Sequence, residues 1–239
     1  MKSYSILAKY YDRFSQNDCD YVGWSQYLCN VAKSCNAKRI VDVACGTGKM
    51  TKLLLEKGFD VLGVDSSLEM LQQAREKCKA TFVCQNMKKL SLPHLADMAV
   101  VVNDGLNYLK PQELAPFFEN LSKNLKVGAP VVFDVSSQYK LQNVLANNVF
   151  FVDEKDATLL WTNKTDDAKT QMNLTVFEKQ GENYRRFDET HLQYVHTQQS
   201  VQTALEQCGF ALQEVSAEYG KPLRQDSLRI TFFAKYLGK

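Results

Sequence analysis

The chain has 239 residues, of which 45% are hydrophobic and 23% charged, which is ordinary for a globular protein and excludes a disordered chain. Its formal net charge of +2 lacks the basic excess of a dedicated nucleic-acid-binding protein, so RNA and DNA substrates are disfavoured without being excluded. The length suffices for one α/β domain with an added segment, or for two small domains.

The first 36 residues predict two helices before the first strand. Apolar and aromatic side chains recur there at helical spacing on both sides of the polar pair Asn17 and Asp18. The positions are Tyr4, Leu7, Ala8, Tyr11, Tyr21, Trp24, Leu28 and Val31. Such a stripe often only packs on a core, so a role in ligand binding needs support from other features.

Residues 39–56 predict a buried strand, a tight glycine turn and a helix. Ile40, Val41 and Val43 form a short β-branched run, residues 46–48 read Gly-Thr-Gly, and helical spacing begins at Lys49. Glycine lets a ligand approach the backbone closely, and such a turn directs free N–H groups at whatever lies above it. The segment therefore predicts a nucleotide-like or otherwise polar ligand resting on backbone.

The spacing around this turn decides between ligands. The residue three after Gly48 is Thr51, where a dinucleotide fingerprint needs a third glycine, and the residue five before it is Val43, where a P-loop needs a glycine. The remaining pattern, D-x-A-C-G-T-G from Asp42 to Gly48, resembles the first motif of the class I S-adenosylmethionine-dependent methyltransferases. Ala44 stands where that family more often has glycine.

The resemblance implies S-adenosylmethionine as cofactor and S-adenosylhomocysteine as product. Within this first motif it implies cofactor contacts from Asp42, Ala44, Cys45, Gly46, Thr47 and Gly48. Residues 4–12 also resemble the Y-x-x-x-A-x-x-Y-D opening of small bacterial members, with Tyr11 and Asp12 in its last two positions. In that family this segment covers the cofactor, so Tyr11 is expected to contact it.

The second predicted strand ends at Asp65. A carboxylate at that place can accept two hydrogen bonds from a ribose diol, and the resemblance gives Asp65 this role. The alternative is that Asp65 caps the helix that begins near Ser67. We favour the ribose and expect Ser66 to cap the helix, with Met70 packed against the adenine ring.

The third and fourth predicted strands end in polar segments. The third reaches Asn86, and Met87 follows it. At the position of Asn86 the family usually has an aspartate that contacts the adenine amino group. The amide oxygen of Asn86 can accept the same hydrogen bond without charge assistance. The fourth spans residues 99–102 and leads to Asn103, Asp104 and Gly105, where the family lines the methionine moiety of the cofactor.

The remaining chain completes a doubly wound α/β fold. A helix is expected from Pro111 to Gly128, then a strand over 130–135, a helix over 198–207 and two closing strands. The alternation of strands and helices predicts parallel pairing with right-handed crossovers. The fold class is therefore a seven-stranded, mostly parallel Rossmann-like methyltransferase sheet with an inserted antiparallel β meander.

The meander is expected between residues 149 and 195, where apolar and polar side chains alternate in segments separated by turns. Leu174 and Val176 should face the domain while Asn173 and Thr175 face away. We expect residues 1–139 and 196–239 to form the cofactor-binding domain. Residues 140–195 are expected to form a lid or substrate subdomain that sets acceptor specificity.

Seven cysteines without a C-x-x-C pair, and a charged N-terminus without an apolar core, predict a reduced cytoplasmic protein. No apolar run approaches the roughly 18 residues of a membrane span, so no membrane association is expected. The three histidines and the cysteines lack a metal-ligand spacing, so no metal site is expected.

The chemistry expected of the chain is methyl transfer by a monomer or a homodimer, with a small molecule as the favoured acceptor. The sulfonium methyl is already electrophilic, so the protein must align a nucleophile and exclude water. If a general base is used, the candidates are Asp104, His191 and Tyr194, although a histidine or tyrosine on a strand is more often a surface residue.

Two other functions stay open. The chain could methylate RNA or protein, with the meander as a docking platform whose basic residues are Lys164, Lys169, Lys179, Arg185 and Arg186. Those charges could equally form a solvated face. The third reading is a binding module that keeps the cofactor site without transferring methyl groups.

Overall fold

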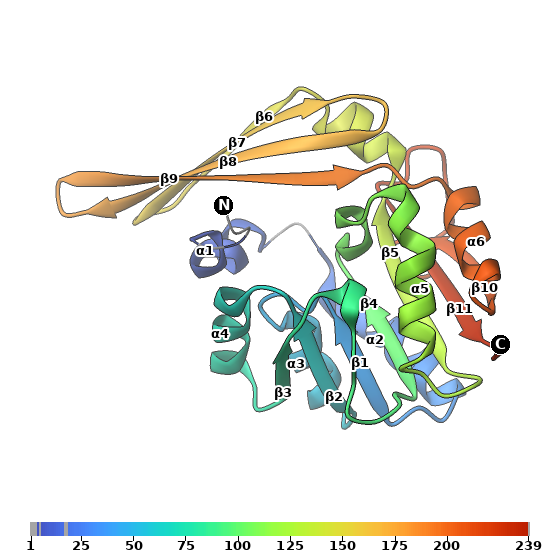
Figure 1. Cartoon of the computed structure of the whole chain (residues 1–239). Coiled ribbons are helices and arrows are strands. Elements are labelled where there is room, and N and C mark those ends of the chain that lie inside the picture. The colour runs from blue at the N-terminus through green and yellow to red at the C-terminus, as the bar shows by residue number, and fades with distance from the viewer. Residues whose placement is uncertain (1–3, 5, 17–18, 239) are drawn as a thin grey trace.

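The computed structural model describes residues 4, 6–16 and 19–238, and it contains two β-sheets (Figure 1). The larger sheet has seven strands in the order β10-β11-β5-β4-β1-β2-β3. These are β1 (Arg39–Val43), β2 (Asp60–Asp65), β3 (Thr81–Cys84), β4 (Met98–Val101), β5 (Pro130–Ser136), β10 (Phe210–Ala217) and β11 (Arg229–Tyr236). Strands β1 to β5 pair in parallel, whereas β11 runs antiparallel to β5 and β10. The predicted fold class is confirmed.

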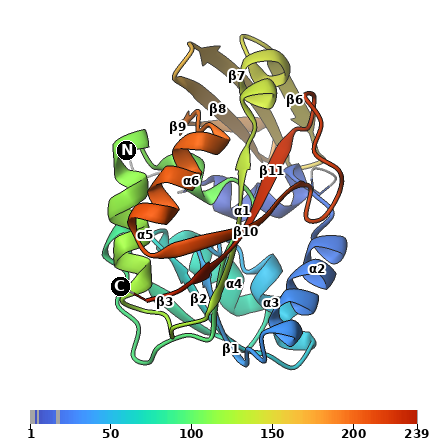
Figure 2. The ribbon, with the colours of Figure 1, turned by 90° about the vertical axis from the view of Figure 1, so that its right-hand side faces the viewer.

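Helices cover both faces of this sheet (Figure 2). The α-helices are α1 (Leu7–Phe14), α2 (Tyr21–Ser34), α3 (Lys49–Glu56), α4 (Leu68–Lys77), α5 (Leu114–Ser122) and α6 (Gln198–Gln207). The short helical segments are η1 (Met87–Lys89), η2 (Gly105–Tyr108), η3 (Pro111–Glu113) and η4 (Lys140–Leu145). Alternate strand residues serve the two faces: Val41 packs in the core under α5 and α6, and Ile40 packs in the core under α2 and α3.

Several predicted boundaries need correction. Strand β3 ends at Cys84 rather than Asn86, and β4 spans residues 98–101 rather than 99–102. The helix expected from Pro111 to Gly128 opens with the 3₁₀ turn η3 and ends at Ser122. Beyond it the Asn124 side chain accepts from the Leu92 N–H at 2.8 Å, which fixes a loop rather than another helical turn. The predicted break at Asn17 and Asp18 lies outside the described residues.

The second sheet is the predicted meander, with the order β6-β7-β8-β9. Its strands are β6 (Val149–Asp153), β7 (Ala157–Thr165), β8 (Lys169–Gln180) and β9 (Asn183–Tyr194). It lies above the carboxyl ends of the parallel strands (Figure 1). Leu174 and Val176 are buried while Asn173 and Thr175 are half-buried, so the predicted alternation is confirmed.

Helix α1 lies between the two sheets and covers the inner face of the meander (Figure 1). Leu7 and Tyr10 of this helix form one apolar cluster with meander residues that include Leu174 and Val176. The Glu178 carboxylate accepts from the Lys9 ammonium and from the Tyr10 hydroxyl, both at 2.5 Å. The inner face of the meander therefore packs against α1.

All seven cysteines are free thiols. Among the described residues, no helix combines the length and the apolar character needed to cross a membrane.

Candidate active site

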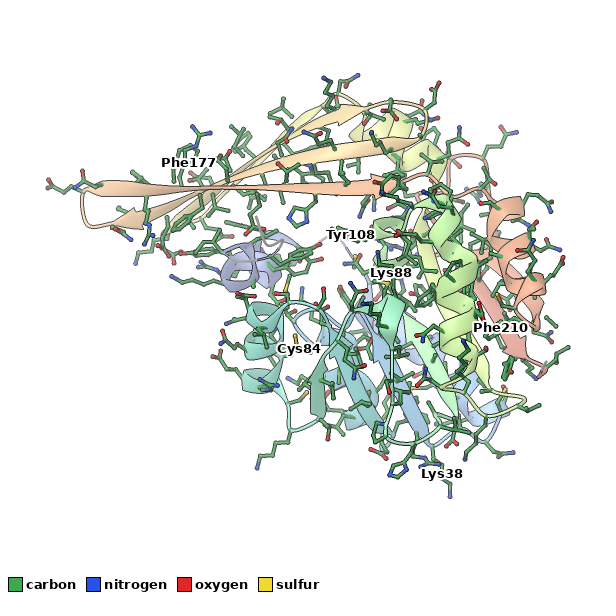
Figure 3. All side chains as sticks on the ribbon, in the orientation of Figure 1. Lys38, Cys84, Lys88, Tyr108, Phe177 and Phe210 are labelled. Carbon is green, nitrogen blue, oxygen red and sulfur yellow. The ribbon has the colours of Figure 1, made fainter. Side chains whose placement is uncertain are left out.

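A cavity of about 510 Å³ lies between the carboxyl ends of the parallel strands, helix α1 and the N-terminal segment. Figure 3 labels Cys84, Lys88 and Tyr108 around this region, beneath the meander. Most of the predicted cofactor residues line it: Tyr11, Ala44, Cys45, Gly46, Thr47, Asp65, Ser66, Met70, Asn86, Met87 and Asn103. The fold therefore gathers, around one cavity, residues that the sequence analysis had selected from four strand ends and the N-terminal helix.

The glycine turn between β1 and α3 shapes the floor of the cavity. Ala44, Gly46 and Gly48 have φ values of +57°, +54° and +74°, a backbone region that favours glycine. A Cβ added at Gly46 would have no described atom within 4 Å, so it would stand in the open space of the cavity. Gly46 thus fits the predicted close approach of a ligand to backbone.

Gly48 serves a different purpose from the one predicted. It does not line the cavity, and an added Cβ would lie 2.9 Å from the Cβ of Ala74 on α4. Gly48 is therefore needed for close packing of the turn against α4 and for its positive φ. A contact between the Gly48 backbone and the cofactor stays a prediction.

Asp65 lies at the end of β2 and binds the turn directly. Its carboxylate accepts from the Gly46 N–H and from the Ser67 N–H, both at 2.8 Å. The Ser67 hydroxyl accepts from the Met70 N–H at 3.1 Å and caps α4, so the prediction that Ser66 is the cap is wrong. A carboxylate has about four acceptor positions, so the backbone donors leave capacity for a ribose hydroxyl. Burial raises the pKa of Asp65 above its ordinary value.

Asp42 does not line the cavity. It is fully buried and its carboxylate accepts from the Thr51 hydroxyl of α3 at 2.5 Å. Burial raises the pKa of Asp42 to about 7. The predicted contact between this side chain and the cofactor therefore has no support in the geometry, and the carboxylate instead joins β1 to α3.

Asn86 and Met70 lie where an adenine ring is expected. Both line the cavity, and Met70 is 2% exposed. The Asn86 side-chain oxygen accepts from the Lys88 N–H at 2.9 Å and caps η1. This contact fixes the orientation of the amide, so its NH₂ group points away from the cap. Their role toward adenine stays a prediction.

Asp104 belongs to a buried cluster of charges rather than to the cavity wall. Its carboxylate pairs with Arg229 at 2.5 Å and with Lys140 at 3.0 Å, and Arg229 also pairs with Asp134. The two cations hold the pKa of Asp104 well below its usual range despite its burial. A carboxylate that is paired twice and does not line the cavity is a poor general base, so the prediction for Asp104 is corrected.

The same cluster fixes Asn103 in the cavity wall. The Arg229 guanidinium donates to the Asn103 side-chain oxygen at 3.1 Å, so the Asn103 NH₂ group is directed to the Tyr11 hydroxyl at 3.0 Å. The Tyr11 oxygen accepts this hydrogen bond at the cavity wall. Burial raises the pKa of Tyr11 above its ordinary value, which keeps it a neutral donor.

Asp12, the last residue of the Y-D motif, joins α1 to the glycine turn. Its carboxylate accepts from the Thr47 hydroxyl at 2.6 Å and pairs with Lys77 of α4 and, at 3.5 Å, with Lys49. Lys77 in turn donates to the Thr47 carbonyl at 2.9 Å. The motif therefore fastens α1 over the turn, a role that the sequence comparison with the family opening did not specify.

His191 and Tyr194 lie on β9 but have different surroundings. His191 is 2% exposed, so it is not the surface residue that a strand histidine often is. Its Nε2 lies 3.2 Å from a Glu189 carboxylate oxygen, and its Nδ1 lies 3.5 Å from the hydroxyl of Tyr108, which lines the cavity. The Tyr194 side chain does not line the cavity. Of the two, only His191 has a contact with the cavity wall.

Sequence reasoning missed Tyr108, Glu189 and Arg229 as parts of the site, and it considered Tyr4 only as part of the segment that covers the cofactor. A signal existed for Glu189, because residues 189, 191 and 193 alternate along one strand and share a face. The pairing of Arg229 with Asp104 joins residues far apart in the sequence, and no local pattern indicates it.

Comparisons with known proteins agree with this geometry. Residues 40–128 match the family model described as a methyltransferase domain. The chain is 32% identical over 224 residues to the Bacillus subtilis (strain 168) protein YqeM, a candidate methyltransferase by its name, and the match covers 90% of each chain.

Solved structures give the same result. The crystal structure of an S-adenosylmethionine-dependent methyltransferase from Clostridium acetobutylicum superposes with a TM-score of 0.88 at 30% identity, covering 99% of this chain and 100% of that one. The sugar N-methyltransferase KedS8 from Streptoalloteichus has a TM-score of 0.77 at 21% identity, covering 93% and 91% of the two chains. At that identity, KedS8 supports the fold alone.

Proposed function

Because this chain belongs to the class I S-adenosylmethionine-dependent methyltransferases, we propose that it transfers the methyl group to a small molecule. The observation that carries the proposal is the size of the cavity at the carboxyl ends of the parallel strands. Its volume of about 510 Å³ lies within the roughly 300–1,000 Å³ usual for small-molecule sites, and Tyr4 and Tyr11 contribute to its wall. An acceptor of modest size fits this space better than a folded RNA or protein.

The residues of the cavity fit the cofactor. S-adenosylmethionine supplies an electrophilic methyl group when it is bound. Gly46 leaves open space above the turn, Asp65 has acceptor capacity left for a ribose hydroxyl, and Tyr11 lines the cavity wall. These residues bind and orient the cofactor, while α1 excludes water from the reacting groups.

The meander and α1 together form the roof of the acceptor space in this proposal. Tyr4 and Tyr108 line the cavity, and the rings of both lie beside the His191 ring of the meander. Residues 140–195 then contribute to acceptor selection, as a subdomain placed over the carboxyl edge of the sheet.

The alternative acceptor, RNA or protein, has weaker support. Two of the basic residues considered for docking already have partners: Arg186 pairs with Asp188 at 2.9 Å and Lys169 with Asp166 at 4.0 Å. Such pairs lower the positive charge that the meander presents to a polyanion.

The test measures transfer of tritium from S-[methyl-³H]adenosylmethionine to a bacterial extract divided by size. We expect label in the fraction below about 1 kDa, insensitive to ribonuclease and protease. Gly46→Val serves as the control that cannot hold cofactor. Label that appears only in RNA or protein fractions would contradict the proposal, and no turnover in any fraction would favour a binding module.

A further inference from the structure

Three side chains, Tyr108, His191 and Glu189, form one chain of polar groups that leads from the cavity wall into the meander. We infer that this chain carries a proton away from the methyl acceptor. Tyr108 contacts the acceptor, and His191 and Glu189 act through it as positioning residues. The inference rests on the proposed function and narrows the acceptor to a molecule that presents an N–H or O–H group.

The hydrogen-bond directions along this chain begin at Glu189. Its two carboxylate oxygens accept from the backbone N–H groups of Tyr4 at 2.7 Å, Ile6 at 2.9 Å and Leu7 at 3.2 Å. The carboxylate is therefore an acceptor, and the His191 Nε2 at 3.2 Å must carry the hydrogen. A neutral imidazole has one N–H, so this network assigns a bare lone pair to Nδ1.

The bare Nδ1 of His191 faces the hydroxyl of Tyr108 at 3.5 Å, so Tyr108 donates to it. Tyr4 and Gln193 then donate to the oxygen of Tyr108. The distance of 3.5 Å is long, and catalytic hydrogen bonds commonly tighten only once the reactants are bound. An acceptor N–H or O–H in the cavity takes the place of one of the two donors to Tyr108.

His191 is placed to hold the proton that arrives. The groups that face it are the Glu189 carboxylate on its own strand, Tyr108 from η2, and the ring of Tyr4 at 4.5 Å. Its cross-strand partner on β8 is the uncharged Met172. The carboxylate therefore balances the imidazolium that forms when His191 becomes protonated.

The bonds and charges of the transfer balance without any further reagent. The acceptor nitrogen or oxygen forms a bond to the methyl carbon, the carbon–sulfur bond breaks, and its electron pair stays on sulfur as a neutral thioether. The acceptor proton passes to the oxygen of Tyr108 while the tyrosine proton passes to Nδ1 of His191. Burial raises the pKa of Tyr108 to about 12, so tyrosinate does not persist and the proton rests on His191.

The first test needs no acceptor. Protein with ¹⁵N-labelled histidine is saturated with S-adenosylhomocysteine, and the ring signals are assigned with His191→Gln. We expect His191 to carry its proton on Nε2 with Nδ1 bare, and we expect Tyr108→Phe to shift the Nδ1 signal. Tyr184→Phe, which changes a tyrosine 59% exposed on the same strand, should leave it unchanged. A proton on Nδ1 of the neutral ring, or no response to Tyr108→Phe, overturns the inference.

The second test measures methyl transfer to the small-molecule fraction of the extract. Tyr108→Phe and His191→Gln should lower the rate at saturating cofactor by about tenfold to a hundredfold, within or below the usual range for general base catalysis. Their affinity for S-adenosylhomocysteine should stay within about twofold of wild type. Glu189→Gln should also lower the rate, because the carboxylate that balances the charge on protonated His191 is gone.

The outcomes separate this inference from the proposed function. If the wild type labels no small molecule, the proposed function fails, and the histidine signals still decide the arrangement of the relay. If wild type and His191→Gln transfer methyl groups at equal rates, the proton path is wrong while the proposed function stands.

Discussion

Substitution of Asp65 tests the ribose assignment and the shape of the turn together. Its carboxylate accepts two backbone N–H groups and, in our assignment, the ribose diol of the cofactor. Hydrogen bonds to a charged group contribute about 1.5–3 kcal/mol. Asp65→Ala should therefore weaken binding of S-adenosylhomocysteine by about tenfold to more than a hundredfold. Calorimetry gives the affinity, and Asp60→Ala, an exposed carboxylate at the other end of β2, is the matched control.

A loss of affinity could come from the diol or from a distorted turn, so the assay includes the 2′-deoxyribose analogue of S-adenosylhomocysteine. If Asp65 binds the diol, the wild type discriminates against the analogue and Asp65→Ala does not, which gives a coupling energy between side chain and hydroxyl. Equal discrimination by both proteins would show that Asp65 acts only through the turn, and our assignment would be refuted.

Three further substitutions test the turn and the residue beneath it. Gly46→Val should abolish cofactor binding while the circular dichroism spectrum stays native. Gly58→Val, at another open position with a positive φ of +89°, is the strained control and should bind the cofactor normally. Similar losses of affinity in both variants would reject the contact between Gly46 and the cofactor. Asp42→Asn should raise the free energy of unfolding in urea by at most about 4 kcal/mol at pH 8 and should leave it unchanged at pH 4. The reason is that the native carboxyl of Asp42 holds its proton up to about pH 7, so the stability of the wild type falls as pH rises through that range. A difference between the two proteins that is independent of pH would contradict this. Ala44→Gly should stabilise the protein by roughly 0.5–1 kcal/mol by relieving a left-handed φ of +57°, and lower stability would be evidence against strain there.

The regular elements follow from local pattern, and the sequence therefore predicts them well. Helix α3 begins and ends at the predicted residues because Gly48 and Gly58 bracket a run of helix formers. The meander shows the same success, since the alternation that buries Leu174 and Val176 has a period of two in the sequence itself. The ends of β3 and β4 are less well predicted, because side-chain caps such as Asn86 decide them.

The polar contacts of the site depend on distant residues, and the sequence predicts them poorly. Asp104 reads as a free carboxylate at a strand end until Arg229 is brought to it by the antiparallel pairing of β11 with β5. His191 reads as a surface residue until Tyr4 and Tyr108 cover it. In each case the chemistry of the group is set by a partner that tertiary packing supplies.

Gly48 has a packing role that its place in the turn does not reveal. A glycine in a turn serves either a ligand or a neighbouring helix, and the spacing alone does not separate the two. The contact at Gly48 lies against Ala74 of α4, while the open space lies at Gly46. Only the position of α4 distinguishes them.

Helix α1 links the two halves of the site, so cofactor and acceptor cannot be treated as independent. Toward the turn, Asp12 binds Thr47 and Lys77; toward the meander, the backbone of Ile6 and Leu7 donates to Glu189. In our proposal, a ligand that orders the turn thereby strengthens a wall of the acceptor space, and an acceptor that orders the meander holds α1 over the cofactor. Because such coupling is reciprocal, each ligand should raise the affinity for the other by the same factor.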